Sequence, residues 1–432
     1  MQLSAVIYEM NQSLLDQQKI MTNSSPSQHP NYTFALIVVF IVCFLIGFIT
    51  TMNNSMIDFC QKAFKLSDWD VQLVNTAFYG AYILSIPFAY LMSKIGYKGT
   101  LILGLAVAGL GFVINFISIN AAIGTAINVF VVYLICMCIV ACGVVMLQNV
   151  ANPYVMVLGS TEKGAFRMTL SQALNSVATT LAPLFIASVI IRGQTPKPEA
   201  VPGPFLGLGI FTLVICLILA FLKLPKIDEG KQDADAGIVR QYKSSAFKYP
   251  HVWLGALGIF MYMGVEIGVP SLIPAKVNSL TDLVVDDNYT TNLLSLYWGG
   301  MMVGRFIGAG ILAKFEPRKL LTACIGLGAT CILLGVFLPG KAGIYAMLAA
   351  GLFHSVMWPL IFNLGLQELG PNTKQATGII NTGVIGGAFL PLLLGWAVGH
   401  FSIIVASCCL FIFYAYIIWF CNWGSKIGLE KK

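Results

Sequence analysis

Charge is the property that this sequence has least of. Only 10% of its 432 residues are Asp, Glu, Lys or Arg, whereas 57% are hydrophobic. A soluble globular domain carries about 25% charged residues, and the mean hydropathy of this chain is +0.82. These values exclude a water-soluble globule and predict a polytopic membrane protein.

The signatures of catalysis are missing as well. The sequence has no Ser–His–Asp set, no Gly-Lys-Ser loop to hold a nucleotide phosphate, and no Cys/His spacing typical of a metal site. We therefore predict that the chain is not an enzyme, uses no cofactor or metal centre, and does not hydrolyse ATP. Most of the 11 Cys lie in apolar runs, as Cys43, Cys136 and Cys408 do, which is typical of small buried hydrophobic residues.

The net charge of +7 comes from Lys and Arg residues spread through the loops. Nucleic-acid-binding proteins instead gather such residues in a patch with interleaved aromatics. The sequence thus predicts no nucleic-acid partner, and its basic loops are typical of the cytoplasmic side of a membrane protein. The polar N-terminus lacks the basic segment, short apolar core and cleavage site of a signal peptide, so no cleaved signal is expected.

Apolar runs predict about twelve membrane-spanning helices, since one span needs about 20 apolar residues. The runs are 33–57, 70–92, 99–119, 124–150, 167–191, 204–223, 252–275, 289–313, 320–339, 342–366, 376–398 and 401–422. One long charged stretch divides them in the middle. We predict a polar tail (1–32), a six-helix bundle (33–223), a cytoplasmic linker (224–250), a second six-helix bundle (251–423) and a C-terminal tail (424–432).

Basic residues near the span ends indicate the orientation. Those on one side are Lys94, Lys98, Lys163, Arg167, the linker, Lys314, Arg318, Lys319, Lys374, Lys426, Lys431 and Lys432. The opposite side holds the scattered Lys62, Lys65, Arg192, Lys197, Lys276 and Lys341. We therefore predict that both termini are cytoplasmic.

The two halves of the chain resemble each other. FYGAYILSIPFAYLMSKIGYK (78–98) aligns without gaps to WGGMMVGRFIGAGILAKFEPR (298–318). Gly80 then matches Gly300, and Lys98 matches Arg318. A span that ends in a basic turn at the same place in each half predicts two parallel, pseudo-symmetric repeats.

The first apolar run ends in an unusual row of polar residues. The stretch FITTMNNSMID (48–58) contains Thr, Asn and Ser side chains. It directly follows Phe34 to Phe48, an almost purely apolar run that is suited to the hydrocarbon core of a membrane. Each unpaired polar group at the bilayer centre costs of order a few kcal/mol. This row therefore faces either water at the end of the helix or a polar cavity.

Two longer motifs carry a family resemblance. LQNVANPYVMVLG (147–159) and FRMTLSQALNS (166–176) are similar to the fucose–galactose–glucose proton symporter family, and closest to its glucose/galactose branch. Three more stretches share it: 260–268, 294–308 and 351–366. SKIGYKG resembles the major facilitator loop motif in a degenerate form, with Ala89 and Ser93 in place of its Gly and Asp.

This resemblance implies a major facilitator fold and secondary transport by alternating access. The expected substrate is a neutral hexose or hexose derivative, and the expected location is the bacterial inner membrane. Symport with H⁺ or Na⁺ by a monomer is the main expectation. A sugar uniporter and a membrane sensor that does not transport are the alternatives.

The resemblance also gives the polar row a meaning. The first helix of the family typically reads N-D-I-L-I-P, and alignment through Gly47, Phe48 and Asn53 puts Asn54 at the acid. An amide cannot exchange a proton near neutral pH. Thr51 and Asn54 then lie on one helix face as substrate-binding candidates, while Asp58 is either a second coupling acid or a solvated carboxylate.

Glu266 is the acid that lies deepest in an apolar span, within YMGVEIG. An ionisable residue inside the membrane is a candidate functional residue, and the resemblance places a Glu or Gln here at the central cavity. We predict that Glu266 binds substrate, couples transport to a cation, or does both. The alternative is a paired or protonated structural Glu.

The other candidates are polar residues of four spans, because amides both donate and accept hydrogen bonds, as sugar hydroxyls require. We predict substrate contacts from Gln148, Asn149, Asn152, Gln172, Asn175, His354, Asn363 and Asn381. Asn152 precedes a proline and could instead satisfy freed backbone groups, and His354 could be core packing. Tyr79 and Trp298 could stack on a pyranose or simply pack, and Arg305 is expected to anchor its helix to a carboxylate or to carbonyl oxygens.

Overall fold

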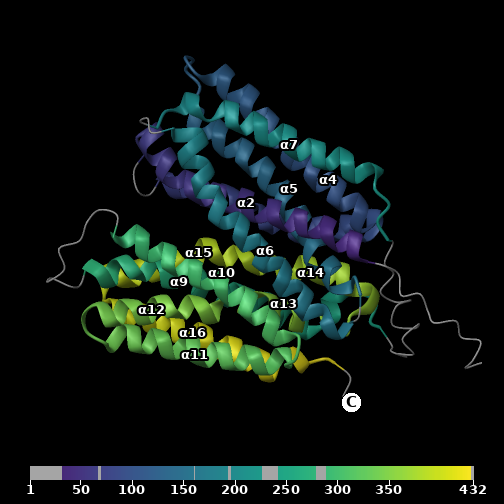
Figure 1. Cartoon of the computed structure of the whole chain (residues 1–432), viewed down its shortest axis with the longest axis vertical. Helices are drawn as coiled ribbons and strands as arrows, with labels where there is room; N and C mark the ends of the chain where they lie inside the picture. Colours follow the sequence, from purple (N-terminus) through teal and green to yellow (C-terminus); the bar gives the residue numbers. More distant parts are fainter. Residues whose placement is uncertain are drawn as a thin grey trace, which may run out of the picture.

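A computed structural model describes residues 32–66, 70–159, 161–192, 196–225, 242–278 and 289–429. Regular structure in these ranges is helical throughout (Figure 1). The first half holds α2 (Thr33–Phe64), α3 (Leu73–Gly80), α4 (Ser85–Ala122), α5 (Val129–Val157), α6 (Gly164–Phe185) and α7 (Pro202–Phe221). The second holds α9 (Pro250–Asn278), α10 (Tyr289–Leu312), α11 (Pro317–Phe337), α12 (Gly340–His354), α13 (Met357–Gly365), α14 (Thr373–Thr382), α15 (Gly386–His400) and α16 (Ile403–Asn422).

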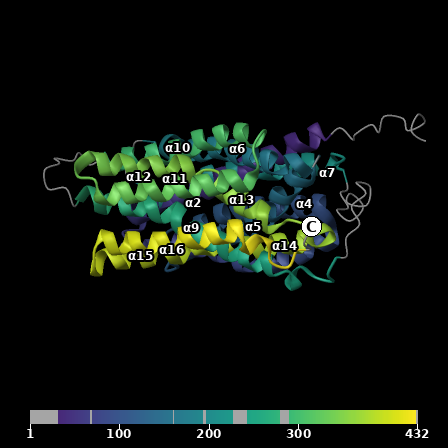
Figure 2. The same cartoon turned by 90° about the horizontal axis from the view of Figure 1, so that it is seen from below.

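These helices form two bundles that lie side by side, one from each half of the chain (Figures 1 and 2). Ten helical segments of the described chain are long and apolar enough to cross a membrane. One of them, Leu73–Ala122, contains two predicted spans. The predicted span 289–313 is α10, whose hydropathy is lowered by Arg305 and several glycines. The prediction of about twelve spans is therefore confirmed.

Several spans are interrupted in ways that the apolar pattern did not predict. The run 342–366 forms α12 and α13, because the helix breaks at Ser355 and Val356, two turn residues just before Pro359. The run 376–398 likewise forms α14 and α15 around the short 3₁₀ turn Gly383–Ile385. Broken helices inside membrane proteins are tolerated where neighbouring helices or a cavity satisfy the backbone.

The basic turns confirm the internal repeat. Gly96 has φ +74°, a left-handed conformation that favours glycine, and it reverses the chain between two spans of α4. Lys98 then donates to Ala220 O at the end of α7, over 2.8 Å. Its counterpart Arg318 donates to Cys421 O at the end of α16. Each bundle thus ties the same turn to its own last helix.

Small residues allow the helices of the first bundle to approach closely. A Cβ on Gly143 of α5 would lie 2.5 Å from Ala108 N and 2.6 Å from Gly104 O, both of α4. Membrane helices commonly associate through such contacts, because lipid provides little hydrophobic drive for their packing. The glycines of these helices therefore set the spacing inside the bundle.

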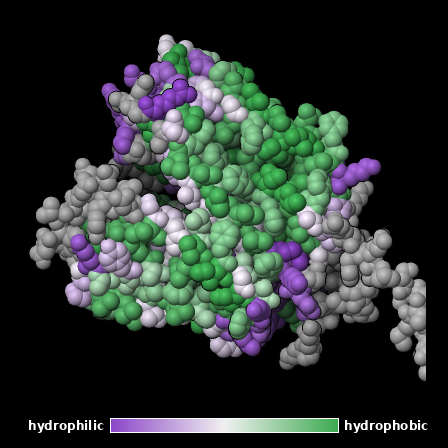
Figure 3. Space-filling model, viewed as in Figure 1, coloured by the Kyte–Doolittle hydropathy of each residue, from purple (hydrophilic) through white to green (hydrophobic). Residues whose placement is uncertain are grey.

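The face of the molecule shown in Figure 3 is largely apolar. Ile135, Leu217, Phe221, Ile412 and Trp423 are each more than half exposed. A soluble monomer rarely exposes so much contiguous apolar surface. This surface is suited to contact with lipid chains.

We refer to the end of the molecule that carries residues 222–225 and 242–249 as the linker end. There α4 and α14 of opposite bundles pack tightly, since a Cβ on Gly378 would lie 2.3 Å from Ala89 Cβ. Lys374 also lies over the Tyr97 ring, 4.8 Å from its centroid. Figure 3 shows a hollow between the bundles toward the opposite end. The bundles are therefore closed together at the linker end.

Candidate functional site

A buried ion pair lies in the second bundle beside the interface. Glu266 of α9 and Arg305 of α10 approach within 3.5 Å, and their side chains are only 13% and 11% exposed. A buried charge is tolerated when it has an opposite charge and hydrogen bonds. The pair makes this part of the interface electrically neutral.

Arg305 also reaches across to the first bundle. Its Nη1 donates to Ser176 Oγ and to Gln172 O, the latter over 3.4 Å, both on α6. Its Nε donates to Ser355 O at the break between α12 and α13, over 3.3 Å. The predicted anchoring of Arg305 to a carboxylate and to carbonyl oxygens is confirmed. Its guanidinium joins both bundles beside Glu266.

Two tyrosines arrange the facing part of the first bundle. The Tyr79 hydroxyl donates to Asn54 Oδ1 over 3.2 Å, and the Tyr82 hydroxyl donates to Gln148 Oε1. Their rings stack with centroids 6.2 Å apart. Gln148 lies four residues before Asn152 on α5, so these two amides share one helix face.

A third hydrogen-bonded pair, formed by two amides, completes this region. Gln172 Nε2 donates to Asn152 Oδ1 over 3.4 Å, while the Gln172 carbonyl accepts from Arg305. We call the resulting set the site cluster. Its members are Asn54, Tyr79, Tyr82, Gln148, Asn152, Gln172, Ser176, Glu266 and Arg305. It combines amides, hydroxyls and one neutralised ion pair at the junction of two bundles.

Comparison with known proteins agrees with this architecture. The sequence pattern of the Major Facilitator Superfamily matches residues 39–391. The chain belongs to the Major Facilitator Superfamily. It is 35% identical over 413 residues to a protein of Brucella abortus biovar 1 (strain 9-941) named "Glucose/galactose transporter", covering 94% of this chain and 97% of that one.

More distant relatives match over nearly the whole chain as well. The "L-fucose-proton symporter" of Escherichia coli (strain K12) is 26% identical over 411 residues, which cover 89% of this chain and 92% of the relative. A crystal structure of the transporter FucP in the outward conformation superposes with a TM-score of 0.78 at 25% identity, over 91% of this chain and 99% of that one. The family resemblance predicted from the sequence motifs is confirmed.

Two predicted site residues of this major facilitator join the bundles outside the site cluster. Asn149 Nδ2 donates to Ser85 O over 2.9 Å, Ser85 Oγ donates to Asn149 Oδ1 over 2.8 Å, and Asn381 Nδ2 donates to the same oxygen over 2.6 Å. Asn149 and Asn381 are fully buried. They join the bundles toward the linker end, and neither is accessible to a ligand in this conformation.

His354 lies inside the second bundle rather than at the interface. It is fully buried, its Nδ1 lies 2.8 Å from the Tyr297 hydroxyl, and its Nε2 contacts the Tyr414 hydroxyl. Tyr262 donates to its carbonyl oxygen over 2.9 Å. The structure favours the core-packing alternative for His354, because its ring nitrogens are both engaged by tyrosines.

Asn175 connects two helices of the first bundle. Its Nδ2 donates to Cys43 O over 2.9 Å, and a Cβ on Gly47 would lie 2.6 Å from the same nitrogen. Thr51 and Asn363 are half-buried, and the side chain of Asp58 lies outside the described part of the structure. Substrate contacts by these residues stay predictions.

Sequence reasoning missed Tyr82 and Ser176. Tyr82 lies in an apolar run, where a tyrosine usually packs, and Ser176 donates to Gln172 O of its own helix, as a helical serine usually does. The one available signal was the spacing of Tyr79 and Tyr82, three residues apart and hence on one helix face. That spacing places Tyr82 beside Tyr79, which was already a candidate to stack on a pyranose.

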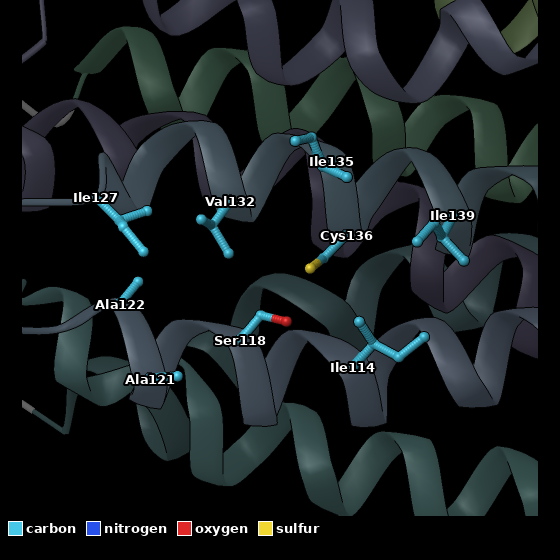
Figure 4. Close-up of a pocket in the computed structure, with 9 residues that line it drawn as sticks. All are labelled: Ile114, Ser118, Ala121, Ala122, Ile127, Val132, Ile135, Cys136 and Ile139. Carbon is cyan, nitrogen blue, oxygen red and sulfur yellow. The ribbon is translucent and has the colours of Figure 1, made fainter. Parts of the chain in front are cut away.

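The groove in Figure 4 is a different feature of the surface. It measures about 370 Å³ and lies between α4 and α5. Its lining is apolar except for Ser118 and Cys136, and Ile127 and Ile135 at its rim are each 58% exposed. A sugar needs several polar partners, so this groove is suited to lipid rather than to a sugar.

Proposed function

We propose that this major facilitator is a secondary active transporter of a neutral hexose or hexose derivative. The observation that carries the proposal is the site cluster, in which amides and tyrosine hydroxyls of one bundle face a neutralised Glu–Arg pair of the other. A site between two pseudo-symmetric bundles is where alternating access requires it. The relatives named for glucose, galactose and fucose transport support a hexose.

The ion pair supports the neutrality of the substrate. Glu266 and Arg305 already compensate each other, at 3.5 Å. An acidic sugar or a sugar phosphate would bring a charge that needs its own partner, and an unpaired buried charge is strongly unfavourable. A hydroxyl-rich neutral molecule needs only hydrogen bonds, which the amides and hydroxyls of the cluster supply.

Cation coupling is proposed to depend on Glu266. In this chain Asn54 stands where the family has an acid, so no proton is exchanged at that position. Glu266 is then the carboxylate of the site cluster, and it either takes up H⁺ or contributes an oxygen ligand to Na⁺. Asp58 remains a second candidate. A uniporter and a sensor that does not transport are the alternatives that the first experiment separates.

The first experiment is uptake into proteoliposomes. We expect radiolabelled D-glucose or D-galactose to accumulate when either a pH or a Na⁺ gradient is imposed. Equilibration without accumulation under both gradients would identify a uniporter. Binding without uptake would identify a sensor, and the absence of both for a panel of neutral hexoses would contradict the proposed function.

The linker end is proposed to face the cytoplasm of a bacterial inner membrane, and the protein is proposed to act as a monomer. The basic turns containing Lys98 and Arg318 support this orientation, because positive loops favour the cytoplasmic side. The closed linker end then corresponds to an outward-open conformation. During transport, the hydrogen bond from Asn381 to Asn149, which joins the two bundles, would have to break.

A cysteine at Ser244 tests this orientation. Ser244 is exposed at the linker end. In a Cys-depleted background, we expect Ser244→Cys to react with an impermeant maleimide only in inside-out vesicles. Labelling in right-side-out vesicles or intact spheroplasts would reverse the orientation.

A further inference from the structure

The hydrogen bonds within the site cluster engage the carbonyl oxygens of its amide side chains and leave their amino groups to contact a ligand. An Asn or Gln side chain has a carbonyl oxygen that accepts and an amino group that donates. Three such oxygens in the first bundle are already engaged: Asn54 Oδ1 by Tyr79, Gln148 Oε1 by Tyr82 and Asn152 Oδ1 by Gln172. The hydrogen bonds among the described residues leave the corresponding amino groups as donors.

Tyr82 fixes the orientation of the Gln148 amide. Tyr82 is only 2% exposed, and a buried hydroxyl needs a hydrogen-bond partner. If the amide turned by 180°, its amino group would face the hydroxyl, and the hydroxyl hydrogen would lose its acceptor. Tyr79, at 6% exposure, holds Asn54 in the same way. Each tyrosine therefore selects one of two amide orientations.

Asn152 gives an independent indication that an acceptor is expected here. Asn152 is 2% exposed, and its Nδ2 has no hydrogen-bond partner among the described residues. An unsatisfied buried donor is costly, so one that persists needs an explanation. A ligand oxygen would satisfy it. This amino group belongs to the same cluster as those of Asn54 and Gln148.

We infer that Tyr82 is a positioning residue that determines specificity by presenting Gln148 to the sugar as a hydrogen-bond donor. The inference rests on the proposed function, because it requires a hexose in the site cluster. The first bundle then contacts lone pairs of hydroxyl oxygens. Glu266 of the second bundle, which accepts hydrogen bonds, contacts O–H groups on the other side of the sugar.

This arrangement makes a prediction about modified sugars. Replacing a hydroxyl by hydrogen removes both its donor and its acceptor, whereas replacing it by fluorine leaves a weak acceptor. At the hydroxyl facing Gln148, a deoxyfluoro sugar should therefore bind better than the deoxy sugar. If Gln148 instead accepted a hydrogen bond from the sugar hydroxyl, the deoxy and the deoxyfluoro sugar would lose the same amount of affinity.

The test measures competition with radiolabelled D-galactose for binding to the purified full-length protein. The competitors are D-glucose, D-galactose, and their deoxy and deoxyfluoro analogues at each position. In the wild-type protein we expect about fivefold preference for fluorine at one or more positions, the size of one hydrogen bond. Tyr82→Phe should lower the affinity ratio of the deoxyfluoro to the deoxy sugar to about one at the position facing Gln148. Gln148→Glu should lower the ratio to about one at the same position.

Two further variants complete the design. Tyr79→Phe should act at a different position of the sugar, because it releases Asn54 rather than Gln148. Tyr133→Phe is the matched control, since Tyr133 is a fully buried tyrosine of α5 outside the site cluster. It should leave every preference unchanged. Thermal unfolding of each variant shows that it is folded.

The outcomes separate the inference from the proposed function. If the wild-type protein binds neither hexose, the proposed function fails. If it binds a hexose, but no position favours fluorine or Tyr82→Phe and Gln148→Glu keep the wild-type preferences, the inference is wrong and the proposed function stands.

Discussion

We expect Glu266→Gln to abolish uphill accumulation of hexose while downhill entry continues. Gln has nearly the same size, but it neither takes up a proton near neutral pH nor offers a charged oxygen to Na⁺. A potential of about 100 mV contributes about 2.3 kcal/mol per charge, enough for roughly 50-fold accumulation. The accumulation ratio in proteoliposomes should therefore fall from that order to about one.

The folded state is the first control for this variant. Neutralising Glu266 leaves the buried Arg305 without its ion-pair partner, so we expect a loss of stability. The wild-type contacts of Arg305 to Ser176, Gln172 and Ser355 should limit this loss. Counterflow exchange measures whether the site still binds and moves sugar. As a second control, Asn54→Asp places an acid in the site cluster, and its transport should gain pH sensitivity. Unchanged accumulation by Glu266→Gln would remove Glu266 from the coupling mechanism.

Gly378→Val is expected to prevent closure of the linker end and to stop transport. A Cβ at Gly378 would lie 2.3 Å from Ala89 Cβ and 2.8 Å from Ser85 O. Real Cβ atoms do not approach so closely, so α4 and α14 must separate. Spin labels at the exposed Ser93 and Pro371, one on each bundle, should show a longer distance in the variant.

Gly326→Val provides the matched control. Gly326 is in α11 of the second bundle, and a Cβ there would have nothing within 4 Å. It carries the same loss of backbone freedom without a clash at the interface. Wild-type uptake and an unchanged label distance in Gly378→Val would show that a side chain at this position does not prevent closure.

The spans were predictable because the bilayer imposes a length and a composition on them. Even 289–313 was found, although it contains Arg305, since the rest of the run is long and apolar. The breaks at Ser355 and Gly383 were not predictable in the same way. They depend on which neighbouring groups satisfy the freed backbone, and that is decided by tertiary packing.

The site was predictable in kind but not in detail. Gln148 and Asn149 are adjacent on one helix and about 100° apart around it, so one contacts Tyr82 and the other Ser85. In a helix that is buried on most sides, hydrophobic periodicity does not show which face meets the cavity. For the same reason the sequence left two alternatives open for His354, a substrate contact and core packing. Tyr82 was missed because a tyrosine in an apolar run is usually explained by packing.

The two ends of the linker are held by different bundles. Tyr154 of the first bundle donates to Pro225 O over 2.9 Å, and Gln375 of the second accepts from Ser245 Oγ over 2.8 Å and from Ala246 N over 2.7 Å. Between these anchors the sequence continues through residues 226–241. A segment of that length can extend to roughly 50 Å.

Each bundle therefore fixes its own end of the connection, and the two anchors lie on different bundles. What the covalent link supplies is a high effective concentration of one half near its partner. The relative geometry of the halves is left to the interface itself, where Arg305, Asn381 and Gly378 meet the first bundle.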